Sequence, residues 1–225
     1  NTVDTQKIKN IYNLRKKIPT KKLKLITIAR YAEKKKGYDL VPIISQKLLE
    51  NNIDFSWTII GQNTNKLFNN EFVNKNKIFF KVFDNINNKD EKYFPHSSVI
   101  DRYINSDLYV NLARIESFGI TFIEAMASGL PIISFNTKGA NEIITNNYNG
   151  YIIDFNDIDN FVKKIKDIYA NKQMLNFVEV NAFGCCEMDF FCKVNDFFTD
   201  FLLETDFLPF PNILSWSLFG FFFLT

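Results

Sequence analysis

The sequence predicts a doubly wound α/β domain, in which helices cover both faces of a mostly parallel sheet. Three observations support this fold class. The chain has 225 residues, 46% of them apolar, which is enough for one large or two small globular domains with a packed core. From residue 22 to residue 172, short apolar runs alternate with segments of helical periodicity. Such a strict alternation of strand and helix is typical of a parallel sheet enclosed by helices.

Strands are expected where short apolar runs stand between turn-forming residues. The first run is KLKLITIA, and the last follows the turn at Asn149 and Gly150. The six predicted strands are residues 22–29, 55–60, 77–83, 107–112, 131–135 and 151–154. The Asn- and Lys-rich residues 84–92 are expected to form a loop.

Helices are expected where apolar residues recur at helical spacing. In residues 39–51, Leu40, Ile44 and Leu48 fall on one side, and Pro42 is tolerated in the first turn. A further helix is expected after Gly119. The other predicted helices are residues 64–74, 97–105, 140–145 and 157–169.

The charge is unevenly distributed, because 12 of the 27 Lys and Arg residues lie within the first 36 residues of a chain whose net charge is only +2. A basic segment suits a phosphate-rich ligand or an anionic membrane surface, and a solvated basic face is the plain alternative.

The three cysteines lie together at residues 185–192 without metal spacing, which supports neither a disulfide framework nor a zinc site. The start of the chain, NTVD, has no apolar leader, and with these cysteines a reducing cytoplasm is the expected compartment. No nucleic-acid partner is expected.

Two glutamates, Glu116 and Glu124, flank an apolar turn in the segment RIESFGITFIEAMASGLPIIS. The amides of Gly119, Ile120 and Thr121 would point out of a helix start, which holds anions, at the carboxyl edge of a strand. A phosphate there would repel two carboxylates that faced it, so we expect them to face neutral vicinal hydroxyls, as in a nucleotide sugar. In the alternative interpretation, Thr121 and Glu124 form a capping box and Glu116 is an ordinary loop carboxylate.

Two cations, Arg30 and Lys36, follow the first predicted strand at the same sheet edge. Arginine makes planar two-point contact with phosphate and lysine supplies a point charge, so together they can neutralise a diphosphate leaving group. A solvated loop accounts well for Lys34 and Lys35. It accounts less well for Arg30, because the end of a buried strand is a costly place for an unpaired charge.

With these residues the chain resembles the C-terminal, donor-binding half of the retaining GT-B glycosyltransferases, often called family 4 or group 1. The resemblance covers residues 1–172, and its most specific part is the pair of glutamates separated by seven residues. The matching segments are Arg30, KG at 36–37, WTIIG at 57–61, ESFG at 116–119, EAMASGLP at 124–131, GANE at 139–142 and NG at 149–150.

The resemblance implies three segments. NTVD is similar to the end of the link between the two GT-B domains, so residues 1–21 are interpreted as a linker remnant, residues 22–172 as a Rossmann-like nucleotide-sugar-binding domain, and residues 173–225 as an atypical Phe-rich tail. Three interpretations of the tail stay open: a buried or interfacial segment, a partial membrane anchor, or an out-of-frame extension not selected to fold here. Its apolar run at residues 213–224 is shorter than the roughly 20 residues of an ordinary membrane span.

The resemblance also implies roles. Arg30 and Lys36 would hold the donor diphosphate, Glu116 would contact hydroxyls of the transferred sugar, and these three are the catalytic residues expected. Glu124 would bind the ribose hydroxyls. The residues expected at the donor site are Arg30, Lys36, Gly61, Glu116, Ser117, Phe118, Gly119, Ile120, Thr121 and Glu124. The implied transfer keeps the anomeric configuration and uses no metal or other cofactor.

A GT-B enzyme closes a cleft between two domains, and the N-terminal one supplies acceptor binding and usually a catalytic histidine. The single histidine here, His96, begins a predicted helix, where a cap or surface role is expected. We therefore expect a fragment or subunit of a polysaccharide-building transferase that is inactive alone. Its expected partners are an unidentified acceptor, a separate N-terminal domain and the cytoplasmic face of the membrane.

Other functions are weighed against this one. The domain could be a non-catalytic module that binds a nucleotide sugar and docks on a separate acceptor half. It could also be another enzyme on this scaffold, such as a sugar-nucleotide epimerase or a phosphorylase with a pyridoxal lysine. A hydrolase that uses Glu116 and Glu124 is least favoured, because its carboxylates must face each other across one bond.

Overall fold

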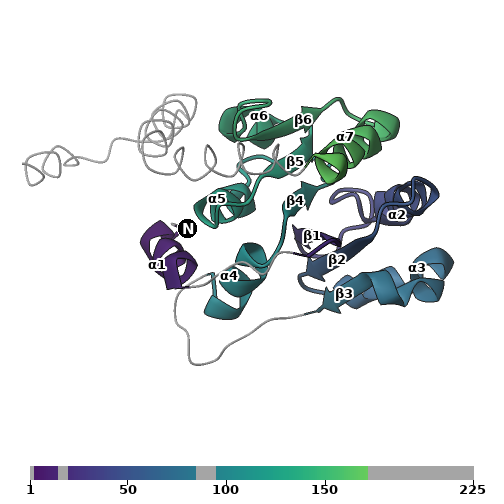
Figure 1. Cartoon of the computed structure of the whole chain (residues 1–225), viewed down its shortest axis with the longest axis horizontal. Helices are drawn as coiled ribbons and strands as arrows, with labels where there is room; N and C mark the ends of the chain where they lie inside the picture. Colours follow the sequence, from purple (N-terminus) through teal and green to yellow (C-terminus); the bar gives the residue numbers. More distant parts are fainter. Residues whose placement is uncertain (1–2, 15–19, 85–94, 172–225) are drawn as a thin grey trace, which may run out of the picture. The chain divides into compact units, whose positions relative to one another are not determined.

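The computed structural model describes residues 3–14, 20–84 and 95–171, and these build a six-stranded sheet with helices on both faces (Figure 1). Every neighbouring pair of strands is parallel. The strands are β1 (Leu23–Ile28), β2 (Phe55–Ile60), β3 (Phe80–Phe83), β4 (Leu108–Asn111), β5 (Ile132–Phe135) and β6 (Gly150–Ile153). The predicted doubly wound α/β fold is confirmed.

The strand order is β3-β2-β1-β4-β5-β6, so the chain crosses the sheet between β3 and β4. β1 therefore pairs with β2 on one side and β4 on the other. The connections that leave β1 and β4 run in opposite directions, and this is the place in an open α/β sheet where ligands bind.

Helices cover the two faces in separate groups. The helices are α1 (Thr5–Leu14), α2 (Val41–Glu50), α3 (Glu71–Lys75), α4 (Ser97–Ile104), α5 (Ile120–Ala127), α6 (Lys138–Ile143) and α7 (Ile158–Ala170), with 3-10 turns η1 (Tyr38–Leu40), η2 (Thr64–Asn69) and η3 (Lys77–Phe79). Side chains of α2, α3 and α7 share one apolar core with the sheet, and those of α4, α5 and α6 share a second core on the other face.

Helix α1 was not predicted, since residues 1–21 were interpreted as linker. The Asp4 carboxylate accepts a hydrogen bond from the Lys7 amide at 2.9 Å and so caps the helix start. Ile8 is fully buried against Ile100 and Ile104 of α4. The segment is therefore held against the second helical layer by apolar contact.

Most predicted elements differ from the observed bounds by one or two residues, and the predicted helix at residues 64–74 is η2 followed by α3. Residues 77–79 form η3 rather than the start of a strand, and Ile78 is 83% exposed there. α6 begins at Lys138, two residues before the predicted start, because the Thr137 hydroxyl accepts from the Ala140 amide at 3.2 Å. Most of the predicted loop at residues 84–92 and all of the tail at 173–225 lie outside the described residues.

Within the described ranges, none of the helices combines the length and the apolar composition that crossing a bilayer requires.

Candidate functional site

The sequence-predicted residues gather where the strand order reverses, between β1 and β4. The loop after β1 carries Lys36, and the loop after β4 carries Glu116. The Lys36 ammonium lies 2.8 Å from Oε2 of Glu116, and the two side chains are only 18% and 19% exposed. Two residues that are 80 positions apart in the chain thus form one half-buried ion pair.

Glu116 also contacts the start of α5. Its Oε1 accepts a hydrogen bond from the Gly119 amide at 3.2 Å, and no side chain caps α5 itself. Gly119 has a φ of +70°, and its left-handed backbone turns the chain into the helix at Ile120. The Phe122 amide donates to the Gly119 carbonyl at 2.8 Å within this turn. The amides at the very start of a helix lie before the first intrahelical bonds, so Ile120 and Thr121 are the candidate donors to an anion.

The other residues of the predicted turn differ in exposure. Ser117 is exposed, whereas Phe118, Ile120 and Thr121 are half-buried. The hydroxyl of the buried Tyr109 donates a hydrogen bond to Oγ1 of Thr121 at 2.8 Å. This bond ties the first turn of α5 to strand β4.

Glu124 is buried, with 9% of its surface exposed. The Tyr103 hydroxyl of α4 donates to its Oε2 at 3.0 Å. Burial raises the pKa of Glu124 to about 7, although the hydrogen bond from Tyr103 opposes the shift. The carboxyl group is thus poised between its two protonation states near neutral pH.

The capping-box interpretation of Glu124 is wrong. α5 begins at Ile120 with Gly119 as its N-cap, so Thr121 is already inside the helix. The Glu124 carboxylate reaches Tyr103 of another helix rather than back to the start of its own.

Arg30 and Gly61 stand at the ends of β1 and β2. Arg30 is exposed, so the argument from a buried strand end does not hold for it, and within the described part of the chain it forms no ion pair with Glu116 or any other residue. The Gly61 amide donates to the carbonyl of Phe83 at 3.0 Å, and its backbone packs closely against Ala29. Both residues lie at the same carboxyl edge as Lys36.

Sequence reasoning missed three residues that hold this site together. The Gly139 amide donates to the Glu116 carbonyl at 2.8 Å. Arg114 forms a two-point ion pair with Asp39, which joins the loop after β4 to the loop after β1. The available signal was the position of Arg114, a charged residue just after an apolar strand and two residues before Glu116.

His96 precedes α4 and is 4% exposed, and its side chain does not cap that helix. His96 thus occupies the predicted N-cap position, where its carbonyl accepts from the Val99 and Ile100 amides, but its ring is buried rather than at the surface.

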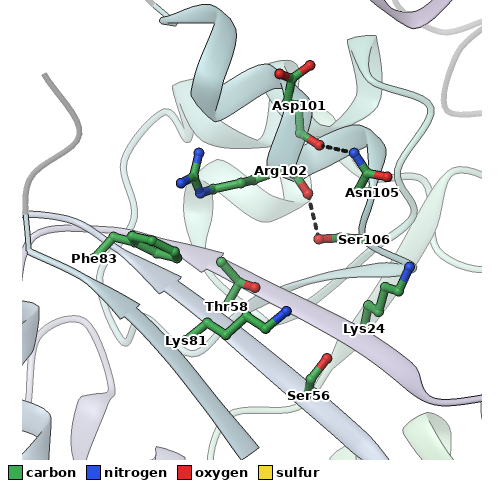
Figure 2. Close-up of a pocket in the computed structure, with 9 residues that line it drawn as sticks. All are labelled: Lys24, Ser56, Thr58, Lys81, Phe83, Asp101, Arg102, Asn105 and Ser106. Carbon is green, nitrogen blue, oxygen red and sulfur yellow. Dashed lines mark hydrogen bonds between the residues drawn. The ribbon is translucent and has the colours of Figure 1, made fainter. Parts of the chain in front are cut away.

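A separate hollow of about 300 Å³ lies between the β1–β3 part of the sheet and α4 (Figure 2). Parallel sheets covered on both faces are usually apolar on both, but here the strands present polar side chains to the helix. The Arg102 guanidinium lies over the Phe83 ring at 4.3 Å at one end. The polar side chains that line the hollow include Lys24, Ser56, Thr58, Lys81, Arg102 and Asn105. None of the predicted donor-site residues lines it.

Among the described residues, no group of three or more His, Cys, Asp or Glu side chains is arranged to hold a metal ion.

The chain is similar to known sugar transferases. A profile of the family described as "Glycosyl transferases group 1" matches residues 10–182. The chain is 32% identical over 77 residues to the UDP-Gal:alpha-D-GlcNAc-diphosphoundecaprenol alpha-1,3-galactosyltransferase of Escherichia coli, over 34% of this chain and 20% of that protein.

Two solved structures share the fold. The pneumococcal O-GlcNAc transferase GtfA, solved in complex with UDP and GlcNAc, superposes with a TM-score of 0.60 at 20% identity, over 82% of this chain and 36% of that one. The C-terminal domain of a glycosyl transferase group 1 protein (LpcC) from Francisella tularensis superposes with a TM-score of 0.58 at 22% identity, over 81% of this chain and 95% of that one. The match thus spans 20% of the Escherichia coli transferase and 36% of the pneumococcal transferase chain, but 95% of the separate C-terminal domain.

Proposed function

Because the chain belongs to the family of glycosyl transferases group 1, we propose that its described domain binds the nucleoside-diphosphate sugar donor of a sugar-transfer reaction. The observation that carries the proposal is the Lys36–Glu116 ion pair beside the first turn of α5. A cation, a carboxylate and the amides at a helix start meet where the strand order reverses, which suits a ligand with both a diphosphate and hydroxyls. The UDP bound by the pneumococcal relative agrees with this choice of ligand.

In the proposed complex the diphosphate replaces Glu116 as the partner of Lys36. The ammonium and the exposed Arg30 then neutralise the charge that builds on the leaving diphosphate. Glu116 is released to accept hydrogen bonds from hydroxyls of the transferred sugar, and the Gly119 amide becomes a donor to phosphate. We further propose, as the family resemblance implies, that the acceptor attacks from the face that the diphosphate leaves, so that the anomeric configuration is retained.

Glu124 is proposed as the ribose contact. An ionised carboxylate can accept from two adjacent hydroxyls at once, and the ribose offers such a pair. Its buried position beside Tyr103 leaves it few orientations, so a bound ribose would meet a fixed acceptor.

Replacing Lys36 with alanine is expected to weaken binding of a nucleoside diphosphate by about 10- to 150-fold, because a charge-assisted hydrogen bond is worth about 1.5–3 kcal/mol. The measurement is titration calorimetry with UDP, GDP and ADP. Uridine, guanosine and adenosine serve as the phosphate-free comparison, and their affinities should not change.

The matched control is Lys47→Ala, which removes another long-range lysine ion pair, with Asp159 at 2.8 Å, between α2 and α7. That variant should bind nucleotides like the wild type. If none of the three diphosphates binds the wild-type chain, or if Lys36→Ala binds them equally well, the proposed donor site is wrong.

We also propose that this domain is catalytically incomplete by itself and acts with an N-terminal acceptor domain. The support is that the chain matches nearly all of a separate C-terminal domain but only 36% of a full-length relative. The purified chain is therefore expected to bind a donor without transferring its sugar. Incubation with UDP-, GDP- and ADP-sugars and a panel of glycan and lipid acceptors tests this, and any transfer product above the hydrolysis background would contradict it.

A further inference from the structure

A single guanidinium, that of Arg114, holds the chain on both sides of Lys36. The Nη1 atom of Arg114 lies 2.6 Å from the carbonyl oxygen of Lys34, and the backbone amide of Arg114 donates to the carbonyl of Lys35 at 3.0 Å. After Lys36, the Asp39 carboxylate pairs with Nη1 at 2.7 Å and with Nη2 at 2.9 Å. We call these four contacts the Arg114 clamp.

The clamp also fixes the partner of Lys36. Arg114 stands two residues before Glu116, at the start of the same loop. The Arg114 side chain therefore links the loop that carries Lys36 to the loop that carries Glu116. Their 2.8 Å ion pair is formed between two loops whose relative position the clamp sets.

The geometry of the clamp distinguishes it from an ordinary surface ion pair. Exposed pairs with one contact often contribute little, but a planar guanidinium that makes two parallel bonds to a carboxylate also fixes orientation. The side chains of Arg114 and Asp39 are 23% and 14% exposed. Burial disfavours the charge on Asp39, but the hydrogen bonds from Arg114 and Lys34 outweigh it and lower the pKa of Asp39.

We propose that Arg114 and Asp39 are positioning residues that hold the Lys36 loop at the distance from Glu116 that the donor diphosphate requires. The proposal rests on the proposed donor site and extends it to residues that touch no part of the donor. Because the clamp does not involve the Lys36 ammonium or the Glu116 carboxylate, it persists when a ligand separates that pair. The loop is then ordered before the ligand arrives, and binding does not have to supply the cost of ordering it.

The first test is Arg114→Lys, which keeps the charge but loses the two-point fork. We expect the affinity for UDP, GDP or ADP, whichever the wild type binds, to fall about 5- to 20-fold while the affinity for the matching nucleoside is unchanged. Asp39→Asn should act in the same direction. Lys47→Ala, on helices away from this edge, should change neither affinity.

Combination with Lys36→Ala separates positioning from general loss of structure. If Arg114 acts through Lys36, Arg114→Lys should cost less than twofold in the Lys36→Ala background. Equal losses in both backgrounds would mean that Arg114 acts on its own or through overall stability, and would overturn the proposal.

Amide hydrogen exchange tests the clamp without any nucleotide. In Arg114→Lys, exchange at the amides of Lys36 and Arg114 should accelerate at least tenfold, while amides of β2 should keep the wild-type rate. Unchanged exchange in this loop would overturn the positioning role even if nucleotide binds as proposed. Accelerated exchange in a chain that binds no nucleoside diphosphate would support the clamp and refute the donor site.

Discussion

Replacing Gly37 with alanine is expected to destabilise the domain by about 2–5 kcal/mol. Gly37 has a φ of +71°, and a left-handed backbone costs an alanine roughly 1–2 kcal/mol. A Cβ there would also collide with the backbone carbonyl of Leu112, at the end of β4, which neither rotamer change nor a flexible side chain can relieve. Forced repacking of this kind adds about 1–3 kcal/mol. The measurement is the free energy of unfolding from urea denaturation.

Gly129→Ala is the matched control for Gly37→Ala. Gly129 has a nearly equal φ of +66°, but a Cβ there would meet only the Tyr12 ring, at 3.2 Å. Gly129→Ala should therefore lower the free energy of unfolding by about 1–2 kcal/mol, from backbone strain alone. If both variants lose the same free energy, the close approach of the two loops does not matter to stability. Because the collision lies beside Lys36, Gly37→Ala should also weaken diphosphate binding, and Gly129→Ala should not.

Replacing Glu124 with glutamine is expected to stabilise the domain by roughly 3 kcal/mol above pH 7. Burial raises the pKa of Glu124 from 4.5 to about 7, and one pKa unit is worth about 1.4 kcal/mol. Between those two pH values the folded chain keeps a proton that the unfolded chain has released, so rising pH destabilises the wild type across this window. Glutamine carries no such penalty, and its carbonyl oxygen can still accept from Tyr103.

Urea denaturation at pH 4, 6 and 8 measures this effect. The stability advantage of Glu124→Gln should be small at pH 4, intermediate at pH 6 and close to its full value at pH 8. An advantage that is the same at all three pH values would show that Glu124 does not titrate in this range.

The same substitution should act in the opposite direction on binding. If the ionised carboxylate accepts the ribose hydroxyls, Glu124→Gln should lose about 1.5–3 kcal/mol of nucleotide affinity. The affinity of the wild type should rise as pH increases through 7, with release of a proton, and the affinity of the variant should not. An affinity that the substitution leaves unchanged would rule out the ribose assignment. A residue that lowers stability and raises affinity is typical of a functional site.

Local patterns predicted the sheet because its strands are apolar runs separated by turns, and each predicted strand overlaps an observed one. They did not predict α1. In that polar segment a few apolar residues become buried only because α4 lies against them, and Ile8 meets Ile100 from 92 positions away. A contact between residues so far apart cannot be recognised from the periodicity of a short sequence window.

The site was predicted in part for a similar reason. The strand alternation placed Lys36 and Glu116 at one edge, and the structure brings them into contact. The pairing of Arg114 with Asp39 depends on which loops become neighbours, which follows from the strand order rather than from either segment. Arg30 illustrates the reverse error, because a strand end inferred to be buried is in fact exposed.

The Lys36–Glu116 ion pair gives the proposed donor site a counterion that belongs to the chain itself. Donor binding is then an exchange of one anion for another rather than the neutralisation of a bare cation. Free salt competes poorly with a carboxylate that the fold holds at 2.8 Å from the ammonium. Phosphate and other small anions should therefore bind Lys36 weakly. A ligand whose hydroxyls can hydrogen-bond to the displaced Glu116 carboxylate should bind more tightly than one that brings only negative charge.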